Sequence, residues 1–345
     1  MVLTIRCLPL RLKIKQHLVL FLFVLNFFFI GSVHAQWYSE TRPIMGTEIS
    51  VSIFKESTSV NQNQIEKKLK KAANIVFEEI NRLNESLSPY IKSSDLTKIN
   101  EFATQSPIKI NNEIKFIIEK SLNYSEISQG AFDITYASVG YLYHYREKVH
   151  PSQNQIDSHL SGINFQNIQL KNNTIYFENK NTKIDLGGIA KGYAVDQGIK
   201  LLKKQNIKIA HVMAGGDSYY LGSHIDRPWI VGIKHPRDAY KIALKIPVED
   251  IAVSTSGDYE RYFVKDGKRY HHIIQPKTGK PSTSGVVSVT VLGPSSIDAD
   301  ALSTTLFVLG VKEGLNLIKT LPNYDAIFID DNGKIHYSTG LISPE

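Results

Sequence analysis

The sequence predicts an α+β fold with a sizeable core. One long amphipathic helix is expected over Gln62–Leu87, because apolar residues recur there at three- and four-residue spacing. From Ile168 onward the chain is rich in segments of β character. A strand-rich chain with a few long helices favours an α+β arrangement over a doubly wound parallel sheet.

The first 35 residues have the features of a targeting segment. Basic residues without an acidic one precede the apolar run Leu18–Ile30, and Val33-His34-Ala35 offers small residues to a signal peptidase. The apolar run is shorter than the roughly 20 residues that a membrane-spanning helix needs. We therefore expect a signal peptide over 1–35, cleaved after Ala35, and a mature domain over 36–345. An uncleaved anchor is the alternative, and membrane association is expected only in that case.

Cysteine usage and net charge limit which cellular compartment and which classes of partner fit the chain. The only cysteine, Cys7, lies before the apolar run, so the mature chain has no disulfide and lipid anchoring through Cys7 is not expected. Export without disulfides fits a bacterial periplasm. The signal carries four of the 40 Lys and Arg residues and no acid, so cleavage lowers the formal charge from +7 to +3 (7 − 4). This charge, without an arginine-rich stripe, argues against a nucleic acid partner.

The elements of the mature chain follow from local patterns. Strands are expected at Thr47–Phe54, Thr174–Phe177, Ala210–Met213, Trp229–Ile233, Lys241–Ile246 and Val286–Leu292. Asp266-Gly267 and Asn332-Gly333 predict hairpins, the first joining Tyr262–Val264 to Tyr270–Ile274 and the second joining Ile327–Ile329 to Lys334–Tyr337. Further helices are expected over Asn112–Gln129 and from about Ser296 to Leu309, ended by Gly130 and Gly310.

The stretch IDLGGIAKGYAVD at 184–196 is the most informative part of the chain. A short β-type run, Lys183–Leu186, is expected to turn through two glycines into a helix that carries Lys191 on its first turn. Free backbone N–H groups, glycines and a mobile lysine suit a phosphate-bearing ligand. The spacing is neither that of a P-loop nor G-x-G-x-x-G. An ordinary turn with a surface lysine is the alternative.

A carboxylate and a hydroxyl recur one helical turn apart at Asp300 and Thr304. Oxygen ligands without a neighbouring histidine or cysteine suit a hard cation such as Mg²⁺. The two residues alone favour the alternative, in which Asp300 caps the start of the helix and Thr304 bonds to the preceding turn.

Three further clusters carry polar side chains. AGGD at 214–217 predicts a turn after a strand, and STSGD at 254–258 suits hydrogen bonds to a polar ligand or a simple loop. His271 and His272 fall on an expected strand, where neighbouring side chains face opposite sides. They are therefore not expected to form a paired metal site, and one of them is expected to be structural.

Nine motifs, taken together and in order, resemble the ApbE family of FAD:protein FMN transferases. They are Met45-Gly46-Thr47, Leu87-Ser88-Pro89-Tyr90, GAFDIT at 130–135, DLGGIAKGYAVD at 185–196, AGGD at 214–217, PWIVGI at 228–233, STSGDYERYF at 254–263, HHIIQPKTGKP at 271–281 and DALSTTLFVLG at 300–310. They cover nearly the whole mature chain. The resemblance implies a single ApbE-type (T-fold-like) domain over 36–345, with the flavin in a cleft between two lobes.

The resemblance also implies an activity. Members split FAD, release AMP and attach FMN by a phosphoester bond to a threonine or serine of an acceptor flavoprotein. They need Mg²⁺, and many are periplasmic, which agrees with the signal peptide. Two other functions fit the same motifs. One is an FAD pyrophosphatase, in which water replaces the acceptor hydroxyl, and the other is a periplasmic flavin-binding or assembly protein without catalysis.

The resemblance implies a set of site residues. The flavin contacts are Met45, Tyr90, Ala131, Phe132, Asp133, Asp185, Lys191 and Ile274. The Mg²⁺ ligands are the Gly188 carbonyl and the side chains of Asp300 and Thr304. His272 and Asp300 are the expected catalytic residues. In this scheme a neutral His272 takes the proton of the acceptor hydroxyl, and Mg²⁺ makes AMP a better leaving group.

Three positions depart from the family pattern. Gln275 stands where the family usually has Asp, and Met213 stands where it usually has Asn. Some members carry an acidic residue at the position of Ser303, so metal affinity is expected to differ here. None of these changes removes Asp185, Asp300, Thr304 or His272.

Overall fold

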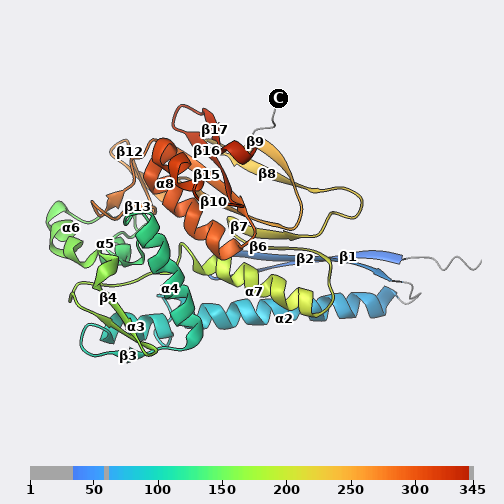
Figure 1. The fold of residues 1–345 in the computed structure, drawn as a ribbon, viewed down its shortest axis with the longest axis horizontal. Helices are drawn as coiled ribbons and strands as arrows, with labels where there is room; N and C mark the ends of the chain where they lie inside the picture. The colour runs from blue at the N-terminus through green and yellow to red at the C-terminus, as the bar shows by residue number, and fades with distance from the viewer. Residues whose placement is uncertain (1–33, 58–61, 342–345) are drawn as a thin grey trace, which may run out of the picture.

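The centre of the computed structural model, which describes residues 34–57 and 62–341, is an eight-stranded antiparallel sheet (Figure 1). Its strand order is β1-β2-β6-β7-β10-β15-β16-β17. The strands are β1 His34–Ile44, β2 Thr47–Ser57, β6 Ile209–Ala214, β7 Asp217–Leu221, β10 Ile251–Gly257, β15 Val286–Gly293, β16 Asp325–Asp330 and β17 Ile335–Tyr337. An antiparallel sheet combined with separate helices confirms the α+β prediction.

Three long helices cover one face of this sheet (Figure 1). They are α2 Gln62–Leu87, α7 Ala190–Lys204 and α8 Ser296–Ile318. The bounds of α2 match the prediction, and its periodic apolar residues, such as Leu69 and Val76, are buried. Gly310 has φ 80° and interrupts α8 where a helix end was predicted, but a second helical stretch follows at once. The prediction that Gly310 interrupts the helix is therefore confirmed, and the prediction that the helix ends there is wrong.

Helix α8 is long and apolar enough to cross a membrane by length and composition, and it is the one such helix among residues 34–57 and 62–341. It packs against β10, β15, β16 and α7, and most of its side chains are buried. We therefore interpret it as the core helix of the fold.

A two-stranded ribbon covers the other face of the sheet. Its strands are β8 Trp229–His235 and β9 Asp238–Val248, both longer than predicted. Alternate residues of β8 point inward, and Trp229, Val231 and Ile233 pack in one cluster with side chains of β10, β15 and β16. The period of two thus places one face of the ribbon on the sheet.

A smaller group of elements gathers at one end of the molecule, below and to the left of the sheet in Figure 1. It holds a three-stranded sheet of β3 Ile108–Lys109, β5 Thr174–Phe177 and β4 Ile168–Lys171. Its helices are α3 Asp95–Phe102, α4 Asn112–Ile127, α5 Ala137–Gly140 and α6 Gln153–His159, with short 3₁₀ turns η1 Ile134–Tyr136, η2 Leu160–Gly162 and η3 Phe165–Asn167. Helix α4 confirms the predicted helix, and Gly130 has the expected positive φ of 80°.

Two short hairpins lie beside the sheet, and a third extends its edge. They are β11 Tyr262–Lys265 with β12 Lys268–His271, β13 Ile274–Gln275 with β14 Lys280–Pro281, and β16 with β17, followed by η4 Thr339–Leu341. The turns at Asp266-Gly267 and Asn332-Gly333 confirm both predicted hairpins. However, β12 ends at His271. The prediction that the strand continues to Ile274 and carries both histidines is wrong, because the chain bends at His272.

Strand β1 has no counterpart among the predicted elements. Its first two residues, His34 and Ala35, pair with β2 across Ser57 and Glu56. The expected cleavage point therefore lies inside β1, and the rest of the predicted signal peptide, 1–33, lies outside the described residues. Cleavage stays a prediction.

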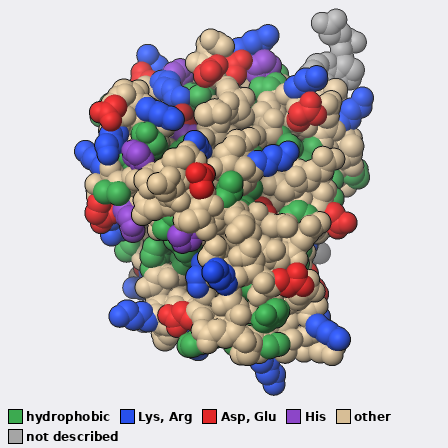
Figure 2. Space-filling view, turned by 90° about the vertical axis from the view of Figure 1, so that its left-hand side faces the viewer, with side chains coloured by type: hydrophobic (Ala, Val, Ile, Leu, Met, Phe, Trp, Pro, Cys, Tyr) green, Lys and Arg blue, Asp and Glu red, His purple; other side chains and the backbone are tan. Residues whose placement is uncertain are grey.

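The end of the molecule on the left of Figure 1 has a mixed surface. Figure 2 shows lysine and arginine side chains interspersed there with aspartate and glutamate, and several histidines in the upper part. Charges of both signs therefore alternate over the described part of this face.

Candidate active site

The segment that precedes α7 is extended but is not a strand, which corrects the prediction for Lys183–Leu186. Asn100 of α3 takes the place of a partner strand. Its side chain donates to the Ile184 carbonyl and accepts from the Ile184 N–H, both at 2.8 Å. The Asp185 N–H donates to the Ile134 carbonyl at 2.9 Å. Because these partners satisfy the backbone, a β-type sequence is accommodated here without a sheet.

Helix α7 begins at Ala190 and carries Lys191 on its first turn, as predicted. The prediction that its N-terminal N–H groups are free is only partly right. The Gly192 N–H donates to Asp300 Oδ2 at 2.9 Å, so a carboxylate from α8 caps α7. A Cβ on Gly192 would lie 2.2 Å from the Ser296 carbonyl oxygen, so only glycine allows the two helices to approach this closely.

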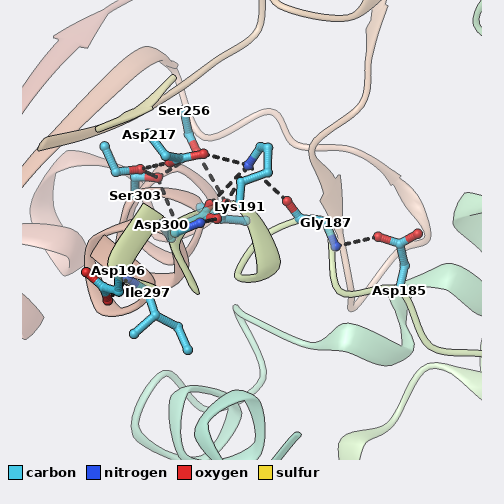
Figure 3. A network of polar contacts seen from close by, with 12 residues as sticks. Asp185, Gly187, Lys191, Asp196, Asp217, Ser256, Ile297, Asp300 and Ser303 are labelled. Carbon is cyan, nitrogen blue, oxygen red and sulfur yellow. Dashed lines mark hydrogen bonds and ion pairs between the residues drawn. The ribbon is translucent and has the colours of Figure 1, made fainter. Parts of the chain in front are cut away.

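The Lys191 ammonium lies between two carboxylates (Figure 3). Its Nζ is 2.7 Å from Asp217 Oδ2 and 3.4 Å from Asp300 Oδ2, and it donates to the Gly187 carbonyl at 3.1 Å. Both carboxylates are only 3 % exposed, whereas Lys191 is 24 % exposed. Asp217 was not among the predicted site residues. Its motif, AGGD, forms the expected turn, but the residue after that turn reaches the centre of the cluster.

Burial and charge shift the titration of this cluster. Burial, first, and the negative charge of Asp217, second, raise the pKa of Asp300 above its ordinary value. Burial lowers the pKa of Lys191, but the attraction of Asp217 and Asp300 outweighs it and holds that pKa above its ordinary value. Lys191 is therefore protonated at neutral pH. Two buried carboxylates share one ammonium, which leaves an excess of negative charge when both are ionised.

A chain of hydroxyl groups leads from Asp217 to Thr304. Ser254 of β10 donates to Asp217 Oδ1 and lies 3.1 Å from Ser303 Oγ. Ser256 lies 2.8 Å from Ser303 Oγ and 3.2 Å from Thr304 Oγ1. Most of the motif STSGD thus lies on strand β10, so the simple-loop alternative is wrong, and its serines bond to side chains of the cluster. Hydrogen bonding to a ligand stays a prediction.

The capping alternative for Asp300 and Thr304 is wrong for their own helix, α8, although Asp300 does cap α7. Asp196 of α7 caps α8 instead, since its carboxylate accepts from the N–H groups of Ser296 at 2.9 Å and Ile297 at 3.0 Å. Thr304 bonds to a serine of β10 rather than to its own preceding turn. The two helices thus cap each other, and the carboxylate and hydroxyl of α8 both point into the cluster.

Asp185 is buried, and three donors surround its carboxylate. The Gly187 N–H and the Tyr136 hydroxyl donate to Oδ1 at 2.7 and 3.1 Å, and the Tyr141 hydroxyl donates to Oδ2 at 3.1 Å. Burial, followed by the negative charge of Asp185, raises the pKa of both tyrosines, so both hydroxyls keep their protons. The carboxylate therefore holds the glycine turn in its shape.

Asp133 is also buried, and its carboxylate accepts hydrogen bonds from neighbouring groups of the protein. Oδ1 accepts from the N–H and hydroxyl of Thr135 at 2.8 and 2.6 Å, and Oδ2 accepts from the Phe165 N–H at 2.9 Å. Burial raises the pKa of Asp133 despite these hydrogen bonds. Beside it Phe132 is buried in the main core and Ala131 is half-buried. The aspartate thus fixes the backbone of this segment.

The other predicted flavin contacts come from three separate elements. Tyr90 follows α2 and is 80 % exposed, which is high for an aromatic side chain. Met45 lies in the β1–β2 turn with φ 56° and is half-buried. A Cβ on the next residue, Gly46, would lie 3.7 Å from a guanidinium nitrogen of Arg261. Ile274 is buried in a small cluster of its own with side chains of α5 and α6.

The two neighbouring histidines have different surroundings. His271 is buried, and its Nε2 donates to the Ser282 carbonyl at 3.0 Å, which makes it the structural histidine. The backbone N–H of His272 donates to the Arg261 carbonyl at 3.0 Å, and its ring nitrogen Nδ1 is buried without a hydrogen-bond partner among the described residues. Burial, first, and the positive charge of Arg261, second, lower the pKa of His272 to about 3. Its imidazole is therefore neutral at physiological pH.

The oxygen atoms beside Lys191 fit a hard divalent cation. A Cβ on Gly188 would lie 3.4 Å from Thr304 Oγ1, so the Gly188 backbone passes close to the Thr304 side chain, one helical turn from Asp300. Among the described residues no group of three or more His, Cys, Asp or Glu side chains converges to hold a metal. This pattern suits Mg²⁺, which uses one or two carboxylates and completes its shell with water and substrate phosphates.

The structure accounts for two of the three departures from the family pattern. The Gln275 carbonyl accepts from the N–H groups of Thr278 and Gly279 at 3.1 and 3.0 Å, so the backbone holds this turn whatever the side chain. Ser303 is fully buried and hydrogen-bonded, also donating to the Asp300 carbonyl at 2.9 Å. Met213 is half-buried on β6, and nothing in the structure explains its replacement of a polar residue.

Comparison with known proteins agrees with this architecture. The ApbE family profile matches residues 45–328. The chain is 30 % identical over 331 residues to the FAD:protein FMN transferase of Treponema pallidum, covering 90 % of each chain. It is 28 % identical over 307 residues to the FAD:protein FMN transferase of Vibrio cholerae, covering 87 % of this chain and 90 % of the relative.

Solved structures share the fold. The ApbE protein of Thermotoga maritima has a TM-score of 0.78 at 32 % identity, covering 88 % of this chain and 98 % of that one. The flavin transferase ApbE of Vibrio cholerae has a TM-score of 0.78 at 27 % identity, covering 89 % and 98 %. The fold is therefore that of the solved flavin transferases, as a single α+β domain. The chain belongs to the ApbE family.

Proposed function

We propose that this protein is an exported, Mg²⁺-dependent FAD:protein FMN transferase. It splits FAD, releases AMP and attaches FMN to a threonine or serine of an acceptor flavoprotein in the periplasm. The observation that carries the proposal is the meeting of Lys191 and Asp300 at the junction of α7 and α8. A phosphate-binding ammonium and a cation-binding carboxylate lie there 3.4 Å apart, which is what a charged pyrophosphate substrate requires. The names of the relatives support the same activity.

The FAD contacts proposed are Met45, Tyr90, Ala131, Phe132, Asp133, Asp185, Lys191 and Ile274. They have different tasks. The exposed ring of Tyr90 offers a face for stacking on a flat ring system. The carboxylates of Asp133 and Asp185 are already hydrogen-bonded to their own chain, so these residues shape the backbone that receives the flavin nucleotide. Lys191 binds the phosphates.

The proposed Mg²⁺ ligands are the Gly188 carbonyl, the Asp300 carboxylate and the Thr304 hydroxyl. When bound, Mg²⁺ neutralises charge on the pyrophosphate and makes AMP a better leaving group. Around it, Asp300 also accepts from the Gly192 N–H, and Thr304 is tied to Ser256, so both side chains are held in place before any ligand arrives.

His272 is the proposed base. The acceptor hydroxyl oxygen attacks the FMN phosphorus, the bond from that phosphorus to the AMP oxygen breaks, and the hydroxyl proton passes to a ring nitrogen of His272. A pKa near 3 keeps the ring neutral and able to accept, but also makes it a weak base. The negative charge of bound pyrophosphate opposes the effect of burial and of Arg261, so FAD binding raises the proton affinity of the ring.

The compartment follows from the N-terminal segment. The basic residues, the apolar run Leu18–Ile30 and the small residues before Gln36 support export. A periplasmic electron-transfer subunit is the expected acceptor, and association with the membrane requires that the segment be retained.

Intact mass of an acceptor tests this function. The purified chain is incubated with FAD, Mg²⁺ and a periplasmic flavoprotein domain, and the acceptor is weighed beside the products in solution. Transfer predicts an acceptor heavier by one FMN, one AMP released for each FMN attached, and no change in an acceptor whose target hydroxyl is removed. AMP and free FMN without any acceptor would identify a pyrophosphatase instead. FAD binding without AMP under every metal condition would identify a non-catalytic flavin-binding protein.

A further inference from the structure

Asp217 is a buried carboxylate that the proposed chemistry does not use. It begins β7, and its Oδ2 makes the shortest contact of the Lys191 ammonium, at 2.7 Å (Figure 3). The second carboxylate of the cluster, Asp300, is 3.4 Å from the same Nζ. The Lys191 ammonium therefore lies closer to Asp217 than to Asp300, and Asp217 is not a proposed ligand of the metal.

This inequality matters because an ammonium and Mg²⁺ compete for a carboxylate. If Lys191 closed fully onto Asp300, its positive charge would occupy the oxygen atoms that the cation needs and would repel the cation directly. Burial strengthens this effect, since Asp300 is 3 % exposed and water screens the two charges poorly. Whatever keeps Lys191 toward Asp217 keeps Asp300 available.

The structure holds Asp217 in place from the other side. The Ser254 hydroxyl donates to Oδ1, and Ser254 is itself linked to Ser303 at 3.1 Å. The Gly187 carbonyl accepts from Lys191 at 3.1 Å and provides a second anchor away from Asp300. Oδ1 of Asp217 thus accepts a hydrogen bond that fixes the orientation of the side chain, and Oδ2 forms the ion pair with the ammonium.

We propose that Asp217 is a positioning residue that holds the Lys191 ammonium away from Asp300 and so leaves Asp300 available to a divalent cation. This inference rests on the metal site of the proposed function. Asp217 acts through Lys191 and is not itself a metal ligand. The distinction has a measurable consequence: a ligand is needed whether or not Lys191 is present, whereas a positioning residue is needed only when Lys191 is there to be held.

A double-mutant cycle on cation binding tests this consequence. Mn²⁺, a spectroscopic substitute for Mg²⁺, is titrated into the full mature chain without FAD, and its affinity is read by electron spin resonance and by calorimetry. Asp217→Asn keeps the shape of the side chain and removes its charge. We expect it to weaken Mn²⁺ binding about tenfold in the Lys191 protein, equivalent to about 1.4 kcal/mol. In the Lys191→Met background the same change is expected to weaken binding less than about threefold.

Ser254→Ala is the milder variant, which keeps both charges and removes the hydrogen bond that orients Asp217. We expect it to weaken Mn²⁺ binding about threefold, in the same direction. It keeps the test decisive if Asp217→Asn does not fold, as judged by circular dichroism and thermal unfolding. In that case, unchanged Mn²⁺ affinity in Ser254→Ala would overturn the inference.

Each result of the cycle has one meaning. An equal loss in both backgrounds would make Asp217 a direct ligand or a general source of negative charge, and the positioning role would be wrong. No loss in the Lys191 protein would also overturn it, while leaving the proposed transferase intact. Absence of Mn²⁺ and Mg²⁺ binding by the unaltered chain without FAD would overturn this inference, and absence of binding with FAD present as well would also overturn the metal requirement of the proposed function.

Discussion

Two half-buried histidines of this chain look alike and lie in contrasting regions. His211 on β6 is stacked on Tyr220, with ring centroids 4.4 Å apart, and belongs to an aromatic cluster with Trp229. Burial alone lowers its pKa to about 4. His272 is bonded through its backbone to Arg261, and burial and then the charge of Arg261 lower its pKa to about 3. Each has a ring nitrogen without a hydrogen-bond partner among the described residues.

The comparison shows that a perturbed histidine is not by itself a sign of chemistry. Around His211 the close neighbours are rings that exclude water, which explains a neutral side chain and gives it nothing to act on. Around His272 the charges of Arg261 and Lys191 both act on the ring, so an arriving anion changes its titration. What separates the two regions is charge in the surroundings rather than the shift itself.

The largest effect on transfer is expected from Asp300→Ala, which removes the proposed metal ligand. We expect AMP release to fall on the order of a thousandfold, while FAD binding weakens only in part because Lys191 and the flavin contacts remain. AMP release at limiting Mg²⁺, with FAD affinity measured separately, checks this. Asp331→Ala, at an exposed position near the β16–β17 turn, is the control. Full activity of Asp300→Ala at limiting Mg²⁺ would refute the assignment.

His272→Ala tests the catalytic role that distinguishes His272 from His211. We expect transfer to slow about a hundredfold, because the acceptor hydroxyl loses its base, and FAD binding to change much less. Single-turnover transfer and FAD titration separate the two quantities. His211→Phe, which alters a half-buried ring in the aromatic cluster, should leave the transfer rate nearly unchanged. Equal losses of transfer and of FAD affinity in His272→Ala would make it a structural histidine.

Tyr90→Ala tests whether the exposed ring of Tyr90 contacts the flavin. Because this ring is 80 % exposed, its loss should leave thermal stability unchanged. We expect FAD binding to weaken about fivefold, as stacking on an aromatic face implies. Fluorescence titration with FAD measures this. Tyr240→Ala on β9, where the side chain is fully exposed, is the matched control, and equal FAD affinity in both variants would exclude Tyr90 from the site.

The smallest effect on transfer, and a distinct effect on stability, is expected from His211→Phe. The unfolded chain binds a proton at His211 below its ordinary pKa of 6.5, and the folded chain does so only near 4. Stability contributed by the neutral ring is therefore complete above pH 6.5 and declines as the pH falls toward 4. Lowering the pH from 7 to 5 therefore reduces the free energy of unfolding of the unaltered protein by about 2 kcal/mol through this group.

Urea unfolding at pH 7 and pH 5 checks the pH effect of His211→Phe. The variant is expected to lose about 2 kcal/mol less on acidification than the unaltered chain, because the remaining groups titrate equally in both. Identical losses would show that His211 is not held neutral by its surroundings.

Much of the fold was predictable because its signals are local. The apolar spacing of α2 marks both ends of that helix, and the Asn-Gly and Asp-Gly pairs mark two hairpins. Errors occur where a distant segment substitutes for a local partner. Lys183–Leu186 has a β-type sequence but bonds to the Asn100 side chain, so it does not join a sheet. Strand β1 was not predicted, although it pairs along its whole length with β2.

The site was predictable in its parts and not in its arrangement. Motif order identifies Lys191, Asp300 and His272, and the structure brings the first two together. The sequence signal for Asp217 was only a turn motif, because its importance comes from contact with α7 and β10 rather than from its neighbours along the chain. The reciprocal capping of α7 and α8 was likewise not visible, since each cap comes from the other helix.

By itself the sequence determined the α+β class, the ends of the long helix, the turns, and family membership through the order of its motifs. These depend on residue periods and on side chains close in the chain. Only the tertiary structure decided which carboxylates share Lys191, which histidine is structural, and which aspartates serve the backbone rather than a ligand. Those outcomes depend on burial and on contacts between residues far apart, such as Lys191 and Asp300, where low dielectric makes small differences in distance matter.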